Sequence, residues 1–98
     1  MEQIVRITHM ESLLDEVTAA LSGLSKSLEQ YERIQPALQE LEAYYGSSLW
    51  RQDFADDEAG LLPSDLKRGV LSEDGIWNLL EEHRRILEEM KRIVEVKP

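Results

Sequence analysis

Apolar residues recur at alternating intervals of three and four positions through the first third of the chain. The series is Ile7, Met10, Leu14, Val17, Leu21, Leu24, Leu28 and Tyr31. This spacing predicts a helix that packs lengthwise against another helix, and Ile4, Leu13 and Ala20 widen its apolar face. Gly23 costs about 1 kcal/mol relative to alanine inside a helix. The apolar positions keep the same phase on both sides of Gly23, so we expect the helix to continue through it.

Pro36 is the first residue that interrupts this pattern. It lacks a backbone donor, and its ring clashes with the carbonyl of Glu32 in a continuous helix. Residues 34–36 therefore have two interpretations. One is a long helix over residues 2–45 that is kinked there, which we slightly favour because no capping residue precedes Pro36. The other is a second helix with Pro36 at its first position. In either case Gly46 is a suitable C-terminal stop.

A second apolar series occupies the last quarter of the chain. It consists of Ile76, Leu80, His83, Leu87, Met90 and Val94, broadened by Leu79, Ile86 and Ile93. This series predicts a C-terminal helix over residues 72–96. The fold class is therefore all-α, with an antiparallel pair of long helices and a short-helix connector in one helical, bundle-like domain over residues 1–98. The alternative is a dimer whose long helices complete each other as a four-helix bundle.

The connector over residues 46–71 contains turn residues, aromatic side chains and clustered charges. In its first half, Ser47 or Ser48 can cap a short helix over residues 49–58, which Gly60 ends.

The second half of the connector leads into the last helix. Ser64 is placed to cap one helical turn over residues 65–68, which Gly69 would close. Ser72 is a candidate N-cap for the C-terminal helix. Gly75 stands at the third helical position, where a capping box would have Glu or Gln. Since glycine has no side chain, we expect another backbone or side chain to approach closely there.

Composition narrows the classes of function. The chain has 98 residues, a net charge of −9 from 20 acids and 11 bases, and no cysteine. The acidic balance argues against direct nucleic-acid binding and against a polybasic membrane patch, and it fits a soluble protein or one that meets a basic partner. The absence of cysteine excludes disulfides and thiolate catalysis. No signal peptide and no membrane span are expected, which favours a cytoplasmic protein.

Charged side chains gather in the connector. They are Asp53, Asp56, Asp57 and Glu58, with Lys67 and Arg68 further along. The acids do not follow the spacing of a calcium-binding loop, so a solvated helix face is favoured over a metal site. The two bases are expected to form a salt bridge that fixes the loop. No nucleophile, base and orienting acid stand at a recognisable spacing, so we expect no enzyme and no cofactor.

The connector sequence resembles a known family. The segments are YYGSSLW and DFADDEAGLLPSDLKRGVLSEDGIWNLL, together with the opening ITHME. The positions that carry the resemblance are Trp50, Asp53, Asp57, Glu58, Gly60, Leu62, Pro63, Asp65, Leu66, Lys67, Arg68, Gly69, Val70, Leu71, Ser72 and Asp74. In these features the chain is similar to the bacterial family called domain of unknown function 4298, whose members often have Tyr where this chain has Trp77. The resemblance implies a small cytoplasmic protein, mostly from Gram-positive bacteria, and implies no activity.

These observations favour a non-enzymatic acidic interaction or regulatory protein that uses residues 50–74 as a binding surface for a basic protein partner. The candidate surface residues are Trp50, Asp53, Asp56, Asp57, Glu58, Lys67, Arg68, Asp74 and Trp77. One alternative is a structural homo-oligomer, such as a homodimer. Another is a small metal- or phospholigand-dependent enzyme that uses the connector charges. If Trp50 and Trp77 are buried, the connector has a packing role at the hinge between the helices and is not a recognition surface.

Overall fold

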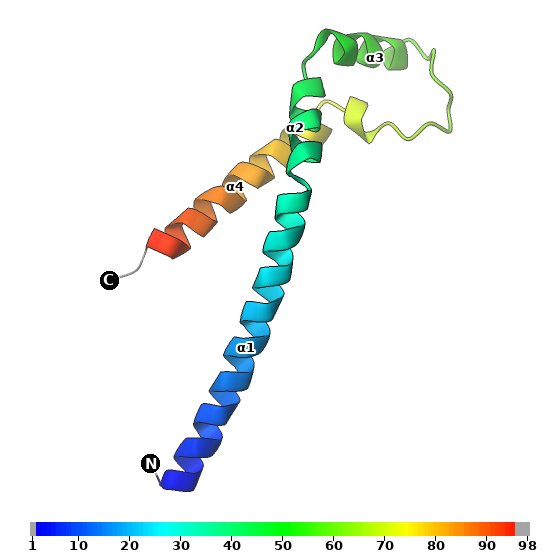
Figure 1. The fold of residues 1–98 in the computed structure, drawn as a ribbon. Coiled ribbons are helices and arrows are strands. Elements are labelled where there is room, and N and C mark those ends of the chain that lie inside the picture. The colour runs from blue at the N-terminus through cyan, green and yellow to red at the C-terminus, as the bar shows by residue number, and fades with distance from the viewer. Residues whose placement is uncertain (1, 96–98) are drawn as a thin grey trace. The chain divides into compact units, whose positions relative to one another are not determined.

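The computed structural model describes residues 2–95, and this part of the chain is all-α, as predicted (Figure 1). Its elements are α1 (Gln3–Arg33), α2 (Gln35–Tyr44), α3 (Ser48–Glu58), the 3₁₀ helix η1 (Gly69–Leu71) and α4 (Gly75–Glu95). The chain divides into two compact units at residues 36 and 37, which are described separately below. The antiparallel pairing of the long helices and the single domain over residues 1–98 stay predictions.

The first unit consists mainly of α1. The Glu2 carboxylate caps its N-terminus by accepting hydrogen bonds from the backbone N–H groups of Ile4, at 3.0 Å, and Val5, at 3.2 Å. The helix continues through Gly23, as the phase of the apolar positions predicted. None of its residues is buried: the large aliphatic side chains are between 40% exposed at Leu13 and 70% exposed at Ile4, and Tyr31 is partly buried. An isolated helix cannot bury its own apolar face, so this face of α1 is exposed within the first unit.

The helical chain is interrupted at Ile34, within the predicted region. Helix α1 ends at Arg33 and α2 begins at Gln35, one residue before the proline. The Ile34 N–H still donates to the Gln30 carbonyl at 3.1 Å. Pro36 has no N–H to donate to the carbonyl four residues earlier, which accounts for the break. The structure thus has a short break between two helices instead of the continuous kinked helix that the sequence slightly favoured.

The second unit begins with α2 and α3, whose ends follow the local sequence signals. Gly46 and Gly60 have positive φ angles of 79° and 73°, in the left-handed region that glycine adopts at low cost. The Ser47 hydroxyl caps α3 by accepting a hydrogen bond from the Trp50 N–H at 3.2 Å. The predictions of a short helix, its cap and its stop are therefore confirmed.

The next segment differs from the prediction. No helical turn forms over residues 65–68, and Gly69 begins η1 instead of closing a turn. A single backbone bond, from the Leu66 N–H to the Pro63 carbonyl at 3.2 Å, bends the chain. The carbonyls of Pro63 and Leu66 also accept hydrogen bonds from the Arg68 side chain, so a side chain and not a helix satisfies this part of the backbone.

Among the described residues of the second unit, Leu71 and Ile76 are the buried side chains, with 6% and 3% of their surfaces exposed. They lie on either side of the Ser72 cap, at positions where apolar residues commonly pack against each other around a helix start. Ser72 adopts extended backbone angles, and its hydroxyl accepts a hydrogen bond from the Gly75 N–H at 3.0 Å. The capping bond that the sequence predicted is present, but α4 begins three residues later than predicted: the Asp74 carbonyl accepts a bond from the Asn78 N–H at 2.8 Å, and Ser72 caps the turn that leads into the helix. Helix α4 begins at Gly75 and is described to Glu95; residue 96, the predicted end, lies outside the described residues.

Candidate functional site: the connector and its surface

Three aromatic rings hold the start of α3 in place. The Trp50 indole stacks on Phe54 with centroids 5.2 Å apart, and Tyr45 meets it edge-on at 5.3 Å. The indole N–H donates a hydrogen bond to the Val70 carbonyl at 2.9 Å. This bond links α3 to η1 across twenty residues of chain. Trp50 is half-buried, and both its ring and its indole N–H already have partners within the protein. Its role is therefore to hold the connector together, not to recognise a partner.

Tyr44 connects the end of α2 to α3. Its hydroxyl donates a hydrogen bond to the Asp53 carboxylate at 2.6 Å. This hydrogen bond, followed by burial and by the negative charge of Asp53, raises the pKa of Tyr44 from 10.0 to about 12. The contact therefore keeps Tyr44 protonated and uses one of the predicted surface acids for internal structure.

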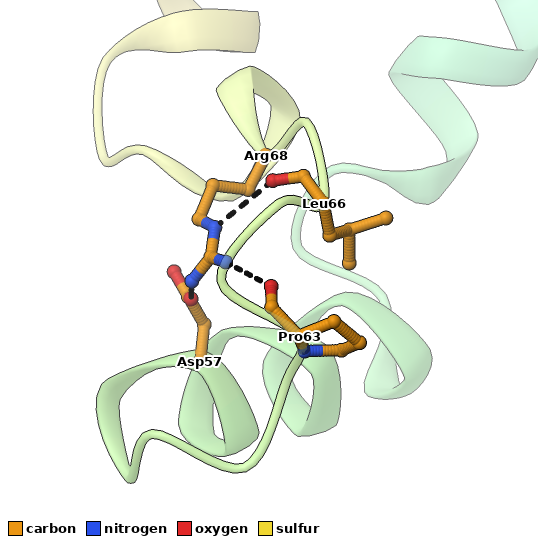
Figure 2. Close-up of polar contacts among 4 residues, drawn as sticks. All are labelled: Asp57, Pro63, Leu66 and Arg68. Atoms are coloured by element: carbon orange, nitrogen blue, oxygen red, sulfur yellow. Dashed lines mark hydrogen bonds and ion pairs between the residues drawn. The ribbon is translucent and has the colours of Figure 1, made fainter.

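Arg68 closes the loop between α3 and η1 (Figure 2). Its guanidinium forms an ion pair with Asp57 and donates to the Pro63 carbonyl, and its Nε donates to the Leu66 carbonyl at 3.2 Å. The Asp57 side chain is only 17% exposed, so water screens this pair less than it screens a pair on an open surface. The predicted loop-fixing salt bridge is confirmed for Arg68, whereas Lys67 is exposed and takes no part in it. Three acceptors around one planar group explain why arginine and not lysine suits this position.

Gly75 lies against the backbone of η1. A Cβ atom at this position would lie 2.3 Å from the Gly69 carbonyl oxygen and 2.7 Å from the Ser72 hydroxyl oxygen. The same hydroxyl donates to the Gly69 carbonyl at 2.9 Å. The expectation of a close approach at Gly75 is therefore confirmed, and the approaching group is a backbone carbonyl.

The remaining candidate residues face outward. Asp56 is partly exposed and accepts a hydrogen bond from the Gln52 side chain at 2.9 Å. The other outward residues are Glu58, Lys67, Asp74 and Trp77, which is 50% exposed. Within residues 2–95 no three acidic or histidine side chains come close enough to hold a metal ion. The predicted surface thus separates into an internal group, Trp50, Asp53, Asp57 and Arg68, and an outward group.

An apolar hollow of about 430 Å³ lies beside this outward group. Its lining comes from α2, the end of the connector, η1 and α4, and consists of Leu41, Lys67, Gly69, Val70, Gly75, Ile76 and Leu79. The sequence interpretation assigned most of these residues to the core or to caps and missed the hollow. The available signal was Gly69, because a Cβ atom at this position would have no neighbour within 4 Å.

The family model for Domain of unknown function (DUF4298) matches residues 7–93. The chain belongs to the DUF4298 family. No curated protein and no solved structure matches the chain significantly. The DUF4298 match extends over the aromatic cluster, the Arg68 contacts and the hollow, so all three lie in the region that defines the family. No helix within residues 2–95 is long and apolar enough to cross a membrane.

Proposed function

We propose that the protein is a non-enzymatic interaction protein of the bacterial cytoplasm that binds a basic protein partner at the hollow between α2, η1 and α4. The observation that carries the proposal is an open apolar hollow next to exposed acids. Glu73 and Asp74 are exposed and directly precede the lining residue Gly75. An apolar side chain of the partner would occupy the hollow, and basic side chains around it would meet these acids. The lack of cysteine suits a reducing compartment.

Charge supports this choice of partner. Residues 46–74 contain seven acids and three bases. Arg68 and Asp57 are paired with each other and Asp53 is bonded to Tyr44, which leaves five acids against two bases, Arg51 and Lys67, the second of which lines the hollow. Exposed acids therefore dominate the outer surface, and complementary charge accelerates association and selects the partner.

The internal contacts of the connector support the proposal indirectly. Trp50, Tyr44 and Arg68 each tie α3 to another segment, so the surface is held in one conformation before a partner arrives. A preformed surface loses less conformational entropy on binding. The sequence interpretation placed the binding surface around Trp50. The present proposal places it at the hollow, and the contacts of Trp50 hold the segments around the hollow in position.

The same contacts disfavour the enzyme alternative. Asp53 and Asp57, two of the acids it requires, are bonded to Tyr44 and Arg68. Carboxylates engaged in this way are less available as metal ligands or as bases.

A matched pair of substitutions tests the proposal. Val70 lines the hollow and is 41% exposed, whereas Leu61 is 71% exposed in the same connector and does not line it. Partners that the tagged wild-type protein captures from bacterial lysate would be purified and titrated by calorimetry. We expect Val70→Glu to weaken binding by about tenfold or more, equivalent to about 1.4 kcal/mol, and Leu61→Glu to leave it unchanged.

Salt provides the second measurement. The affinity for a basic partner should decrease when the salt concentration is raised from about 0.05 to 0.2 M, because the charges on the two surfaces are exposed.

A purified partner that binds wild type and Val70→Glu equally would contradict the proposed surface.

A further inference from the structure

We infer that the hollow binds the C-terminal residue of the protein partner: its apolar last side chain enters the hollow, and the α-carboxylate of the chain end pairs with Lys67. The inference rests on the proposed function, because it takes the hollow as the contact surface and adds which part of the partner enters it. Three features carry it, namely a base in the wall of the hollow, the apolar character of the remaining wall, and the acids just outside it.

Lys67 places a positive charge in the wall of the hollow. Among the described residues that line the hollow it is the charged one, and the others are leucines, an isoleucine, a valine and glycines. Lys67 is exposed, and within residues 2–95 its side chain forms no ion pair and no hydrogen bond. The ammonium group is therefore available to donate to an anionic group of an occupant.

The neighbouring base, Arg68, is used differently. Its guanidinium is engaged by Asp57 and by the carbonyls of Pro63 and Leu66. These contacts close the loop between α3 and η1 without any contribution from Lys67. Of two consecutive bases, one therefore holds the connector together and the other remains free for a contact with another molecule.

The apolar part of the wall limits the size and chemistry of the occupant. A volume of about 430 Å³ is near the lower end of the range of small-ligand pockets, roughly 300–1,000 Å³. The hollow therefore suits a single side chain and the backbone next to it, not the face of a helix. Val70 and Leu79 are 41% and 42% exposed, so an apolar side chain can cover them. An apolar side chain next to a carboxylate matches this wall.

The acids beside the hollow indicate where that carboxylate stands in the partner. Glu73 and Asp74 are exposed just before Gly75, and Asp65 is exposed two residues before Lys67. These acids repel a segment that carries acidic residues and favour a basic one. A chain end supplies a carboxylate beside an apolar side chain without any acidic residue, and capture of a C-terminal carboxylate is a recurring mode of peptide recognition. A basic segment with an apolar last residue thus fits the hollow, Lys67 and the acids together.

Paired peptides test which group of the partner is bound. The probes are acetylated tetrapeptides of two arginines, a glycine and a last leucine, one with a free C-terminal carboxylate and one with a C-terminal amide. Their binding to the 98-residue protein would be followed by NMR chemical shifts, which detect weak complexes. We expect the carboxylate peptide to bind about two- to fivefold more tightly, because it alone can pair with the exposed ammonium group of Lys67.

Substitutions of Lys67 locate the carboxylate. Lys67→Met keeps an apolar stem in the wall and removes the charge, so we expect it to abolish the difference between the two peptides. Lys67→Arg keeps the charge and should preserve the difference. Equal binding of the two peptides to wild type would overturn the inference, and so would a difference that persists in Lys67→Met.

A third peptide, in which the leucine is followed by a glutamate amide, distinguishes the chain end from an acidic side chain. If it binds as tightly as the leucine carboxylate, the anionic group is a side chain and the C-terminal inference is wrong. Val70→Glu tests the hollow separately and should weaken the binding of every peptide. If no peptide binds, or if all bind equally, the inference fails, while a protein partner whose binding Val70→Glu weakens would still support the proposed function.

Discussion

Gly75, the first residue of α4, is the glycine where an added side chain would meet the closest contact. Its missing side chain allows the Gly69 carbonyl to lie where a Cβ atom would be 2.3 Å away. Neither a backbone carbonyl nor the start of a capped helix can move far, so we expect Gly75→Ala to destabilise the protein by about 1–3 kcal/mol. Urea unfolding followed by tryptophan fluorescence measures this change.

Gly69→Ala is the matched control for this experiment. A Cβ atom at Gly69 would have no neighbour within 4 Å, and its φ angle is not in the left-handed region. Its unfolding free energy should stay within about 0.5 kcal/mol of wild type. Equal stability losses for the two substitutions would show that the loss of glycine flexibility, and not the close carbonyl, determines the effect.

Tyr44 gives the connector a pH-dependent contact. Its pKa is raised from 10.0 to about 12, so the folded protein holds this proton more tightly than the unfolded chain does. The contribution to stability is therefore complete below pH 10.0, declines as the pH rises toward about 12 and is lost above it. Spectrophotometric titration of tyrosinate should show a step near pH 12 that is absent in Tyr44→Phe and moves to lower pH in Asp53→Asn. A step that Asp53→Asn leaves in place would contradict the hydrogen bond as its main cause.

At the scale of helices and turns, the features that the sequence predicted are those fixed by a few neighbouring residues. Gly46 and Gly60 were identified as stops, and Ser47 and Ser72 as caps, because a cap depends on atoms two or three residues away. The close approach at Gly75 was also predictable, since the expected capping Glu was absent. The nature of the approaching group was not.

The features that the sequence missed depend on the path of the chain. Arg68 was expected to pair with an acid, but its bonds to the carbonyls of Pro63 and Leu66 replace the helical turn predicted over residues 65–68. The bond from Trp50 to the Val70 carbonyl spans twenty residues. Backbone acceptors have the same chemistry in every residue, so no side-chain pattern reveals which carbonyl a distant donor will reach.

The break between α1 and α2 gives a prediction at this scale. Pro36 cannot donate to the Glu32 carbonyl, and proline inside a helix costs about 3 kcal/mol relative to alanine. In Pro36→Ala the new N–H can make this bond, so we expect α1 and α2 to merge into one helix through Ile34. Hydrogen exchange should show greater protection of the amides around residue 34, and circular dichroism should show greater helicity.

Pro63→Ala is the control for Pro36→Ala, because Pro63 lies outside the helices and its carbonyl remains available to Arg68. It should leave helicity unchanged. If Pro36→Ala also leaves exchange near residue 34 unchanged, the break has a cause other than the missing donor.

At the scale of the whole molecule, the distribution of buried residues implies that folding and association are coupled. A chain of this length ordinarily buries roughly 65% of the surface of its unfolded state. Here α1 has no buried residue, and the buried apolar side chains of the second unit are Leu71 and Ile76. The described part of each unit therefore has little fully buried apolar surface of its own. Association of the exposed apolar faces would add to this burial and so to the stability of the folded state.

Association of two copies through the apolar face of α4 would be measurable, because it would stabilise the folded state by mass action and make the thermal midpoint depend on protein concentration. With an unfolding enthalpy of about 0.7 kcal/mol per residue for both chains, a tenfold increase in concentration would then raise the midpoint by roughly 4 °C. Ile86→Lys, which places a charge on the apolar side of α4, would remove this dependence, while Asn78→Lys, which places the same charge on the opposite side, would keep it. If the thermal midpoint of the wild-type protein stays constant over a hundredfold range of protein concentration, the folded state does not depend on association of two chains.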